Sequence, residues 1–380
     1  MVDCYVIKGA LLPRQDGGLD RVDILLADGV IAEGPTPADA KPIDGEGLLA
    51  LPGLIDLHGD AFERQMMPRP GVHFPSDLAL LETDRQMLAN GITTAYHGLT
   101  LSWEPGLRSI QAGRDFIAAL QAVRPRLACD TRLHLRFETY NLDALEEAIN
   151  WIETGKVDLL AFNNHVPDIL QKTSTNAGTA KYADRAGMDA DAFRALLVTI
   201  SAREAEVPAA MARLAAAGLA AGLPMASHDD ESPAMRDDWQ ALGAEICEFP
   251  LNEATAHHAH DAGSFNIMGA PNILRGGSHA GRLGAMDMVR QGLCDVLTSD
   301  YYYPSMIEAA FRIARDGVLP LARAWALISA NPAKAAGLTD RGRIATGLRG
   351  DILLVDGAAE RPDVRAVFVS GRPVLLRNRA

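Results

Sequence analysis

The sequence predicts an α/β protein, a (β/α)₈ TIM-like barrel with a small β-sandwich domain formed by both termini. Between residues 54 and 330, short apolar or alternating runs take turns with segments rich in Ala, Leu and Arg. Both ends of the chain instead carry short β-like runs separated by Gly, Pro and Asp. Strand–helix alternation repeated eight times favours a barrel, with an open doubly wound sheet as the alternative.

The N-terminal β-like runs are CYVIKGALL and VDILLADGVIAEG, and the C-terminal ones are DILLV and VRAVFVSGRPVLL. We therefore expect residues 1–50 and 338–380 to form the small β-domain and residues 51–337 to form the barrel. The expected barrel strands are 54–58, 92–99, 132–138, 157–165, 224–230, 245–250, 265–272 and 295–301. Helical patterns lie between most of them, at 78–90, 142–154, 189–221 and 305–315.

The composition of the chain restricts the classes of molecule that the protein can bind. Hydrophobic residues make up 48% of the 380 residues, the net charge is −13, and the basic residues are scattered. These features exclude wholesale disorder and argue against a nucleic-acid partner. The most apolar stretch, 209–226, is interrupted by Arg213 and Pro224, so no membrane span is expected. Four widely spaced cysteines and the lack of a signal-peptide pattern predict a cytoplasmic protein with reduced, mostly buried thiols.

Polar side chains follow several expected strands. In RLHLRFE (132–138), alternation places His134, Arg136 and Glu138 on one face. His58 and Asp60 end the first strand at a spacing that puts both side chains on one face. Other strand ends carry His165, His228 with Asp229 and Asp230, and Asp300. Because a barrel gathers its strand ends at one mouth, these residues predict a site for Zn²⁺, Mn²⁺ or Fe²⁺.

Three other features of the sequence involve histidines or glycines. The histidines of HHAH (257–260) lie in a helical pattern and are expected on a solvated face. His97 on the second strand suits either the pocket or the core. The loop RGGSHAG (275–281) lacks the spacing of a dinucleotide fingerprint, but its backbone N–H groups with Arg275, Ser278 and His279 suit phosphate oxygens.

The motifs LPGLIDLH, SHDD, MGAPNILRGGSHAG and NPAKAAGL, with the two-ended β-domain, resemble the amidohydrolase superfamily. Within it, the chain looks like the PhnM group of diphosphatases in phosphonate metabolism. The resemblance implies one or two divalent ions, with Zn²⁺ the first choice and Mn²⁺ or Fe²⁺ as alternatives. The implied metal ligands are His58, Asp60, Glu138, His165, His228 and Asp300, with Glu138 as the bridging carboxylate. The sixth strand, EICEFP, lacks the superfamily's usual histidine, which favours one ion over two.

The resemblance implies hydrolysis of α-D-ribose 1-methylphosphonate 5-triphosphate. In that reaction, activated water attacks the phosphorus nearest the ribose, and pyrophosphate leaves. Asp300 is the expected catalytic proton acceptor and donor. The expected substrate-binding residues are Arg69, Arg136, Arg275, Ser278 and His279, with Lys172 and Lys181 as further candidates. The segment after the fourth strand departs from the group's pattern, so a C–N hydrolase with the same metal site is an alternative. A non-catalytic ligand-binding barrel is a second alternative, and a homodimer is a further prediction.

Overall fold

A computed structural model describes residues 4–69, 71–276 and 283–377. Eight parallel strands form one sheet in chain order, and a bridge between Gly59 and Asp300 joins its first and last strands. They are β6 (Leu54–Gly59), β7 (Ile92–Leu101), β8 (Asp130–Glu138), β9 (Leu159–Asn163), β10 (Met225–His228), β11 (Ile246–Glu248), β12 (Phe265–Gly269) and β13 (Val296–Thr298). The predicted barrel is therefore confirmed, with a strand in each of the eight expected segments.

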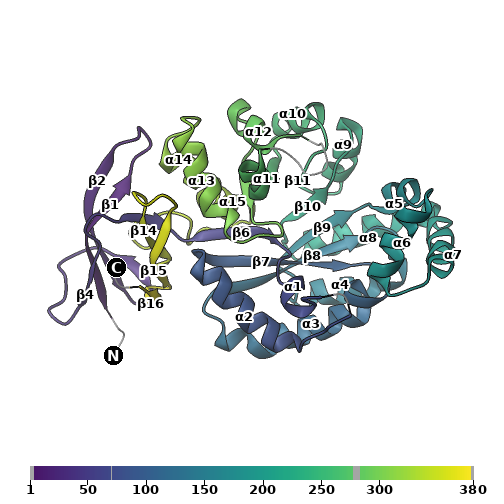
Figure 1. The fold of residues 1–380 in the computed structure, drawn as a ribbon, viewed down its shortest axis with the longest axis horizontal. Helices are drawn as coiled ribbons and strands as arrows, with labels where there is room; N and C mark the ends of the chain where they lie inside the picture. Colours follow the sequence, from purple (N-terminus) through teal and green to yellow (C-terminus); the bar gives the residue numbers. More distant parts are fainter. Residues whose placement is uncertain (1–3, 70, 277–282, 378–380) are drawn as a thin grey trace.

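Helices surround this barrel (Figure 1). They are α1 (Glu63–Met66), α2 (Ser76–Ala89), α3 (Ile110–Val123), α4 (Leu145–Glu153), α5 (Val166–Lys172), α6 (Asn176–Ala186), α7 (Ala190–Ser201), α8 (Val207–Ala220), α9 (Pro233–Ala241), α10 (Glu253–Asp261), α11 (Ala270–Arg275), α12 (Ala285–Gln291), α13 (Ser305–Arg315), α14 (Leu321–Ala326) and α15 (Ala330–Ala335). Helices α5, α6 and α7 gather at the end of the barrel away from the chain termini (Figure 1). Among the described helices, none is long and apolar enough to cross a membrane.

The helical pattern at 189–221 is wrong as a single helix, because two helices, α7 and α8, cover it. A short 3₁₀ turn, Glu204–Glu206, separates them, and Pro208 stands in the first turn of α8. Proline has no N–H to donate, and its ring clashes with the carbonyl four residues earlier. A continuous helix therefore cannot pass through this position, whereas a helix start accepts proline readily.

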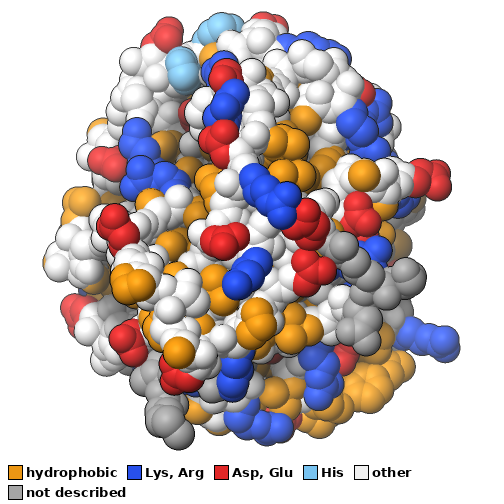
Figure 2. All heavy atoms as spheres, turned by 90° about the vertical axis from the view of Figure 1, so that its left-hand side faces the viewer, with side chains coloured by type: hydrophobic (Ala, Val, Ile, Leu, Met, Phe, Trp, Pro, Cys, Tyr) orange, Lys and Arg blue, Asp and Glu red, His pale blue; other side chains and the backbone are white. Residues whose placement is uncertain are grey.

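Both chain ends build a second sheet, as predicted. Its strands are β1 (Tyr5–Pro13), β2 (Leu19–Ala27), β3 (Val30–Ala32), β4 (Lys41–Asp44), β5 (Leu49–Pro52), β14 (Ile352–Asp356), β15 (Asp363–Val369) and β16 (Arg372–Leu376). The N-terminal β5 pairs antiparallel with the C-terminal β14, which joins the two ends of the chain. Ile7, Leu26, Ile352 and Phe368 form part of the buried core of this sheet. The face of the molecule on this side carries charges of both signs (Figure 2).

Candidate metal centre and active site

The side chains expected to bind metal lie where strands end. Glu138, His228 and Glu248 are the last residues of β8, β10 and β11. His165 follows β9, and Asp300 follows β13. Since all eight strands are parallel, these ends meet at one mouth of the barrel, where this architecture places its chemistry.

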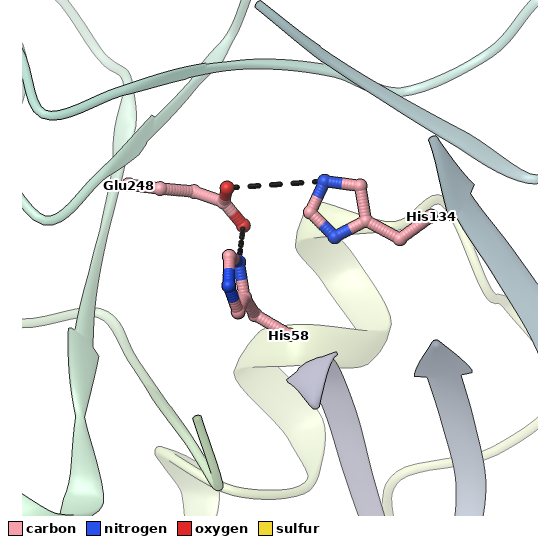
Figure 3. A group of neighbouring side chains, drawn as sticks. All are labelled: His58, His134 and Glu248. Carbon is pink, nitrogen blue, oxygen red and sulfur yellow. Dashed lines mark hydrogen bonds and ion pairs between the residues drawn. The ribbon is translucent and has the colours of Figure 1, made fainter. Parts of the chain in front are cut away.

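A buried inner group consists of His58, His134 and Glu248. The Glu248 carboxylate faces both imidazoles, as Figure 3 shows, with 3.1 Å from Oε1 to His58 Nδ1 and 3.8 Å from Oε2 to His134 Nε2. The other ring nitrogen of His134, Nδ1, lies 3.0 Å from the carbonyl oxygen of Leu57, which fixes the orientation of the ring. Such a nitrogen, held by a backbone carbonyl, is typical of metal-ligating histidine.

An outer group consists of His165, His228 and Asp229. His165 Nδ1 lies 2.5 Å from Glu138 Oε1, and its Nε2 lies 3.8 Å from Asp229 Oδ2. The rings of His58 and His228 are 5.5 Å apart between centroids, so the inner and outer groups are neighbours. The arrangement could therefore hold two ions close together.

Arg136 lies between the outer group and Asp60. One guanidinium nitrogen is 3.2 Å from His228 Nε2, and the other is 3.7 Å from Asp60 Oδ2. The Arg136 side chain lies against Gly98 of β7, where a Cβ would be only 3.2 Å from Arg136 Cδ. Glycine at this position therefore gives the arginine room to reach the mouth.

The turns that carry the site hold unusual backbone conformations. Asp229, Phe249 and Asp300 have φ angles of 60°, 55° and 53°, in the left-handed region that non-glycine residues seldom adopt. Each lies one or two residues beyond a barrel strand. Such conformations cost free energy and cluster at functional sites, which agrees with the placement of the mouth.

Burial tunes the protonation of the histidines. It lowers the pKa of His58 and His228 well below the ordinary value and that of His134 to about 3. These three imidazoles are therefore neutral near pH 7 and offer a lone pair, the form that binds metal. Burial also lowers the pKa of His165, but Glu138 and Asp229 overcome this effect and raise it to about 9, so metal binding at this imidazole would release a proton.

The carboxyl groups are tuned too. Burial, with the nearby Asp60 carboxylate, raises the pKa of Asp300 to about 7. Burial also raises the pKa of Asp60 and Glu248 above their ordinary values. A carboxyl group whose pKa lies near the working pH can both accept and return a proton, as the sequence predicts for Asp300.

The residues present fit a divalent cation. His134 Nε2, His228 Nδ1 and Glu248 Oε2 are buried polar atoms for which the described residues supply no hydrogen-bond partner. An unsatisfied buried polar atom costs free energy, whereas coordination to an ion would satisfy it. Imidazole nitrogen with carboxylate oxygen is also the donor set of Zn²⁺, Mn²⁺ and Fe²⁺ sites.

A cavity of about 190 Å³ opens beside the outer group. Its lining includes the cations Arg108 and Arg136 and the hydroxyl-bearing Thr100, Ser102 and Tyr182. Carboxylates line it as well, namely Asp60, Glu104, Glu138 and Asp168. Because carboxylates outnumber arginines in this lining, the cavity would attract an anionic substrate only with a divalent cation bound beside it.

Four other predicted substrate-binding residues that the structure describes, Arg69, Lys172, Lys181 and Arg275, are not in this cavity lining. Arg69 is exposed in the loop after α1, and Lys172 is exposed and pairs with Asp168. Lys181 is exposed on α6. Arg275, at the end of α11, donates from Nη1 to the Tyr301 hydroxyl over 3.1 Å. Ser278 and His279 lie outside the described residues.

The predicted ligand set left out His134, although the sequence placed it among the polar strand residues, and sequence reasoning did not single out Glu248 or Arg108. Alternation placed His134 on the same face as Glu138, but the resemblance assigned only Glu138 of this strand as a ligand. Glu248 ends the sixth strand, where the resemblance led us to look for a histidine and not for a carboxylate ligand. His97 proves to be a core residue, since its ring lies 4.9 Å from Phe62 and 6.1 Å from Phe116. His257 is exposed and His258 pairs with Asp237, which confirms the solvated helix face.

The sequence profile of the amidohydrolase family matches residues 49–374. The chain belongs to the amidohydrolase family. It is therefore a hydrolase of that superfamily, and its family typically binds divalent metal, in keeping with the two ligand groups.

Among known proteins, the chain is 33% identical over 346 residues to the α-D-ribose 1-methylphosphonate 5-triphosphate diphosphatase of Escherichia coli, covering 88% of this chain and 90% of the relative. It is 29% identical to an adenine deaminase of a Methylobacterium species, but spans only 58% of that protein's length. Its fold resembles that of N-isopropylammelide isopropylaminohydrolase from Burkholderia multivorans, with a TM-score of 0.65, 19% identity and 99% of both chains covered.

Proposed function

We propose that the chain is a metal-dependent diphosphatase that hydrolyses α-D-ribose 1-methylphosphonate 5-triphosphate, or a closely similar ester, to the 5-phosphate and pyrophosphate. The similarity to the Escherichia coli diphosphatase over nearly the whole of both chains supports this reaction. The structural observation that carries the proposal is a histidine- and carboxylate-rich centre beside a cavity lined by two guanidinium groups, Arg108 and Arg136. We place the reaction in phosphonate metabolism and in the cytoplasm.

The metal ligands proposed here extend the set predicted from the sequence. His58, His134 and Glu248 would hold one ion, and His165, His228 and Asp229 a second, with Asp60, Glu138 and Asp300 as further carboxylates at the same mouth. Zn²⁺ is our first choice, with Mn²⁺ or Fe²⁺ as alternatives. Such an ion, when bound, supplies Lewis acidity that activates water and neutralises phosphate charge.

The residues of the chain supply the proton transfer and the positioning. An Asp300 carboxylate oxygen takes the proton of the attacking water as the new P–O bond forms at the phosphorus nearest the ribose. The bond from that phosphorus to the bridging oxygen breaks, and Asp300 returns the proton towards the leaving pyrophosphate. Arg108 and Arg136 would bind phosphate oxygens, because a planar guanidinium matches two such oxygens at once.

The test is product analysis with the metal-loaded protein. We expect pyrophosphate and the 5-phosphate in equal amounts from the triphosphate ester, and no turnover after removal of metal with a chelator. Restoring Zn²⁺ or Mn²⁺ should restore turnover. Release of single phosphates instead of pyrophosphate would contradict the reaction, even if the metal dependence held.

A C–N hydrolase is the second candidate. The similarity to adenine deaminases supports it, and so does the excess of carboxylates over arginines in the cavity lining, which suits a neutral or cationic substrate better than a triphosphate. Ammonia release from adenine by the metal-loaded protein, with no pyrophosphate from the triphosphate, would favour this candidate. The proposed metal ligands would be the same in both reactions.

A further inference from the structure

The barrel closes at an irregular seam between β6 and β13, the first and last of its strands. Each other neighbouring pair of strands forms a ladder, whereas in the described part of the chain these two are joined by the single bridge between Gly59 and Asp300. Deeper in the seam, the segment after α14 lies between them. The N–H of Ile55 donates to the carbonyl of Ile328 over 2.9 Å, and that of Leu297 donates to Leu327 over 2.8 Å.

The carboxylate of Asp56 fills this seam between the inserted segment and the mouth. Its Oδ1 accepts from the Ser299 backbone N–H over 3.0 Å, and its Oδ2 accepts from the Ser299 hydroxyl over 2.6 Å. Asp56 and Ser299 are both 0% exposed. The hydrogen bonds of the Asp56 carboxylate to Ser299 therefore take the place of a backbone ladder between β6 and β13.

Gly59 leaves room for this arrangement. A Cβ at Gly59 would lie 2.7 Å from Asp56 Oδ2 and 3.2 Å from the Ser299 hydroxyl oxygen. Any larger side chain would push the carboxylate away from its partner. The need for space at this position thus explains why a glycine stands between His58 and Asp60, the two expected metal ligands at the end of β6.

Ser299 directly precedes Asp300, whose backbone is held in the left-handed region with a φ of 53°. The N–H of Asp300 donates to the His58 carbonyl, and the N–H of Asp60 donates to the Asp300 carbonyl, each over 2.9 Å. Asp56 thus holds one side of Ser299 while the end of β6 holds Asp300. A turn bound on both sides keeps the Asp300 backbone in a conformation that it would seldom adopt freely.

We propose that Asp56 is a positioning residue that acts through Ser299 to fix the Asp300 carboxylate at the barrel mouth. The inference rests on the role given to Asp300 in the proposed function. A purely structural role explains the residue poorly, because burying a carboxylate costs free energy that an apolar side chain of similar shape would not. Leucine has that shape.

The test compares Asp56→Leu with Asp56→Asn in the full-length, metal-loaded protein. Asparagine can still accept the Ser299 N–H at Oδ1 and can donate from Nδ2 to the Ser299 hydroxyl, so it keeps the geometry and loses only the charge. Leucine loses both hydrogen bonds to Ser299 and also the longer one, 3.4 Å, that the His58 N–H donates to Asp56 Oδ1. Asp84 provides the control, since it is also a buried carboxylate that accepts a backbone N–H, from Cys129 over 2.9 Å, but sits on α2.

We expect Asp56→Leu to lower kcat about 100-fold with KM within about twofold, since a displacement near 1 Å can cost that much. Asp56→Asn should keep most of kcat. In the Co²⁺-loaded protein, the visible absorption spectrum should change for Asp56→Leu and stay as in wild type for Asp84→Leu, whatever stability either variant loses. If Asp56→Leu does not fold, Ser299→Ala, which loses only the hydroxyl contact, should lower kcat about tenfold with KM unchanged.

Wild-type kcat and Co²⁺ spectrum in Asp56→Leu, or in Ser299→Ala if only that variant folds, would overturn the proposal. It would also fail if Asp56→Asn were as defective as Asp56→Leu, because charge and not geometry would then matter. The spectrum needs no substrate. A wild-type protein that releases no pyrophosphate would therefore refute the proposed reaction while the spectral comparison still tested the role of Asp56.

Discussion

Glu248 occupies the end of the sixth barrel strand, where the superfamily usually has a histidine. Its carboxylate is 0% exposed and faces His58 and His134. We expect Glu248→Gln to weaken metal binding at least about tenfold, because an amide is a poorer ligand than a carboxylate. Metal content after dialysis, measured by mass spectrometry, checks this. A glutamine variant that keeps all its metal would remove Glu248 from the ligand set.

Arg108 is the cation of the cavity that sequence reasoning did not find. It is half-buried and pairs with Glu63 over 3.3 Å. Losing a charge-assisted hydrogen bond costs about 1.5–3 kcal/mol, so Arg108→Gln should raise KM for the triphosphate ester about 10- to 100-fold with metal content unchanged. Arg114→Gln is the matched control, since Arg114 is exposed on α3 and pairs with Glu147. Equal KM values in the two variants would argue against phosphate binding at Arg108.

His97 links stability to pH. Burial lowers its pKa to about 4 from the ordinary 6.5. The unfolded chain therefore binds the proton more readily between these two values, so this residue makes the fold lose stability as pH falls from 6.5 towards 4. At about 1.4 kcal/mol for each pKa unit, the loss is about 3 kcal/mol. Denaturant unfolding of wild type and His97→Phe at pH 7.5 and 4.5 should show a smaller pH effect in the variant, whereas parallel profiles would contradict it.

At the scale of the elements, periodicity predicted which segments become strands but not how far each helix runs. The pattern at 305–315 matches α13 residue for residue, because a strongly amphipathic stretch ends where its periodicity ends. The pattern at 189–221 runs through two helices, because an Ala- and Leu-rich periodicity continues across the break at Pro208. The inserted segment at Leu327–Ile328 was not predicted, since only the closed barrel brings it between β6 and β13.

Members of the candidate site could be predicted from the sequence where a single strand determines their position. His58, Glu138, His165, His228 and Asp300 stand at strand ends in the sequence itself. Which ligands share an ion depends on strand neighbours in space, so the grouping of His58 with His134 and Glu248 could not be predicted. Arg108 follows β7 in a loop whose course is set by tertiary contacts, and loop courses leave little trace in a single sequence.

Arg341 connects the segment before β14 with the barrel strands. Its Nη1 donates to Asp130 Oδ2 over 2.6 Å and to the Thr94 hydroxyl over 2.9 Å, and it is 7% exposed. Asp130 is partly exposed and keeps Arg132 as a second partner at 3.2 Å, so losing the charge-assisted bonds of Arg341 costs about 1.5–3 kcal/mol. Arg341→Met should therefore lower the unfolding free energy by about that amount, measured by denaturant unfolding, while the exposed neighbour variant Arg343→Met changes it little. Equal effects from both would contradict this role.

At the scale of the whole molecule, the charge of −13 opposes a triphosphate at long range. Binding would then depend on local cations, supplied by bound metal together with Arg108 and Arg136. The two sheets have different roles. The barrel carries the candidate metal ligands at its mouth, and the second sheet pairs strands from the two ends of the chain.

Hydrolysis of the triphosphate ester in ¹⁸O-labelled water, followed by ³¹P NMR, tests the proposed reaction most directly. If water attacks the phosphorus nearest the ribose, the label appears in the 5-phosphate and the pyrophosphate is unlabelled, with no turnover in metal-free protein. Label in the pyrophosphate would mean attack at the next phosphorus. That result, or turnover without metal, would contradict the proposed chemistry at this site.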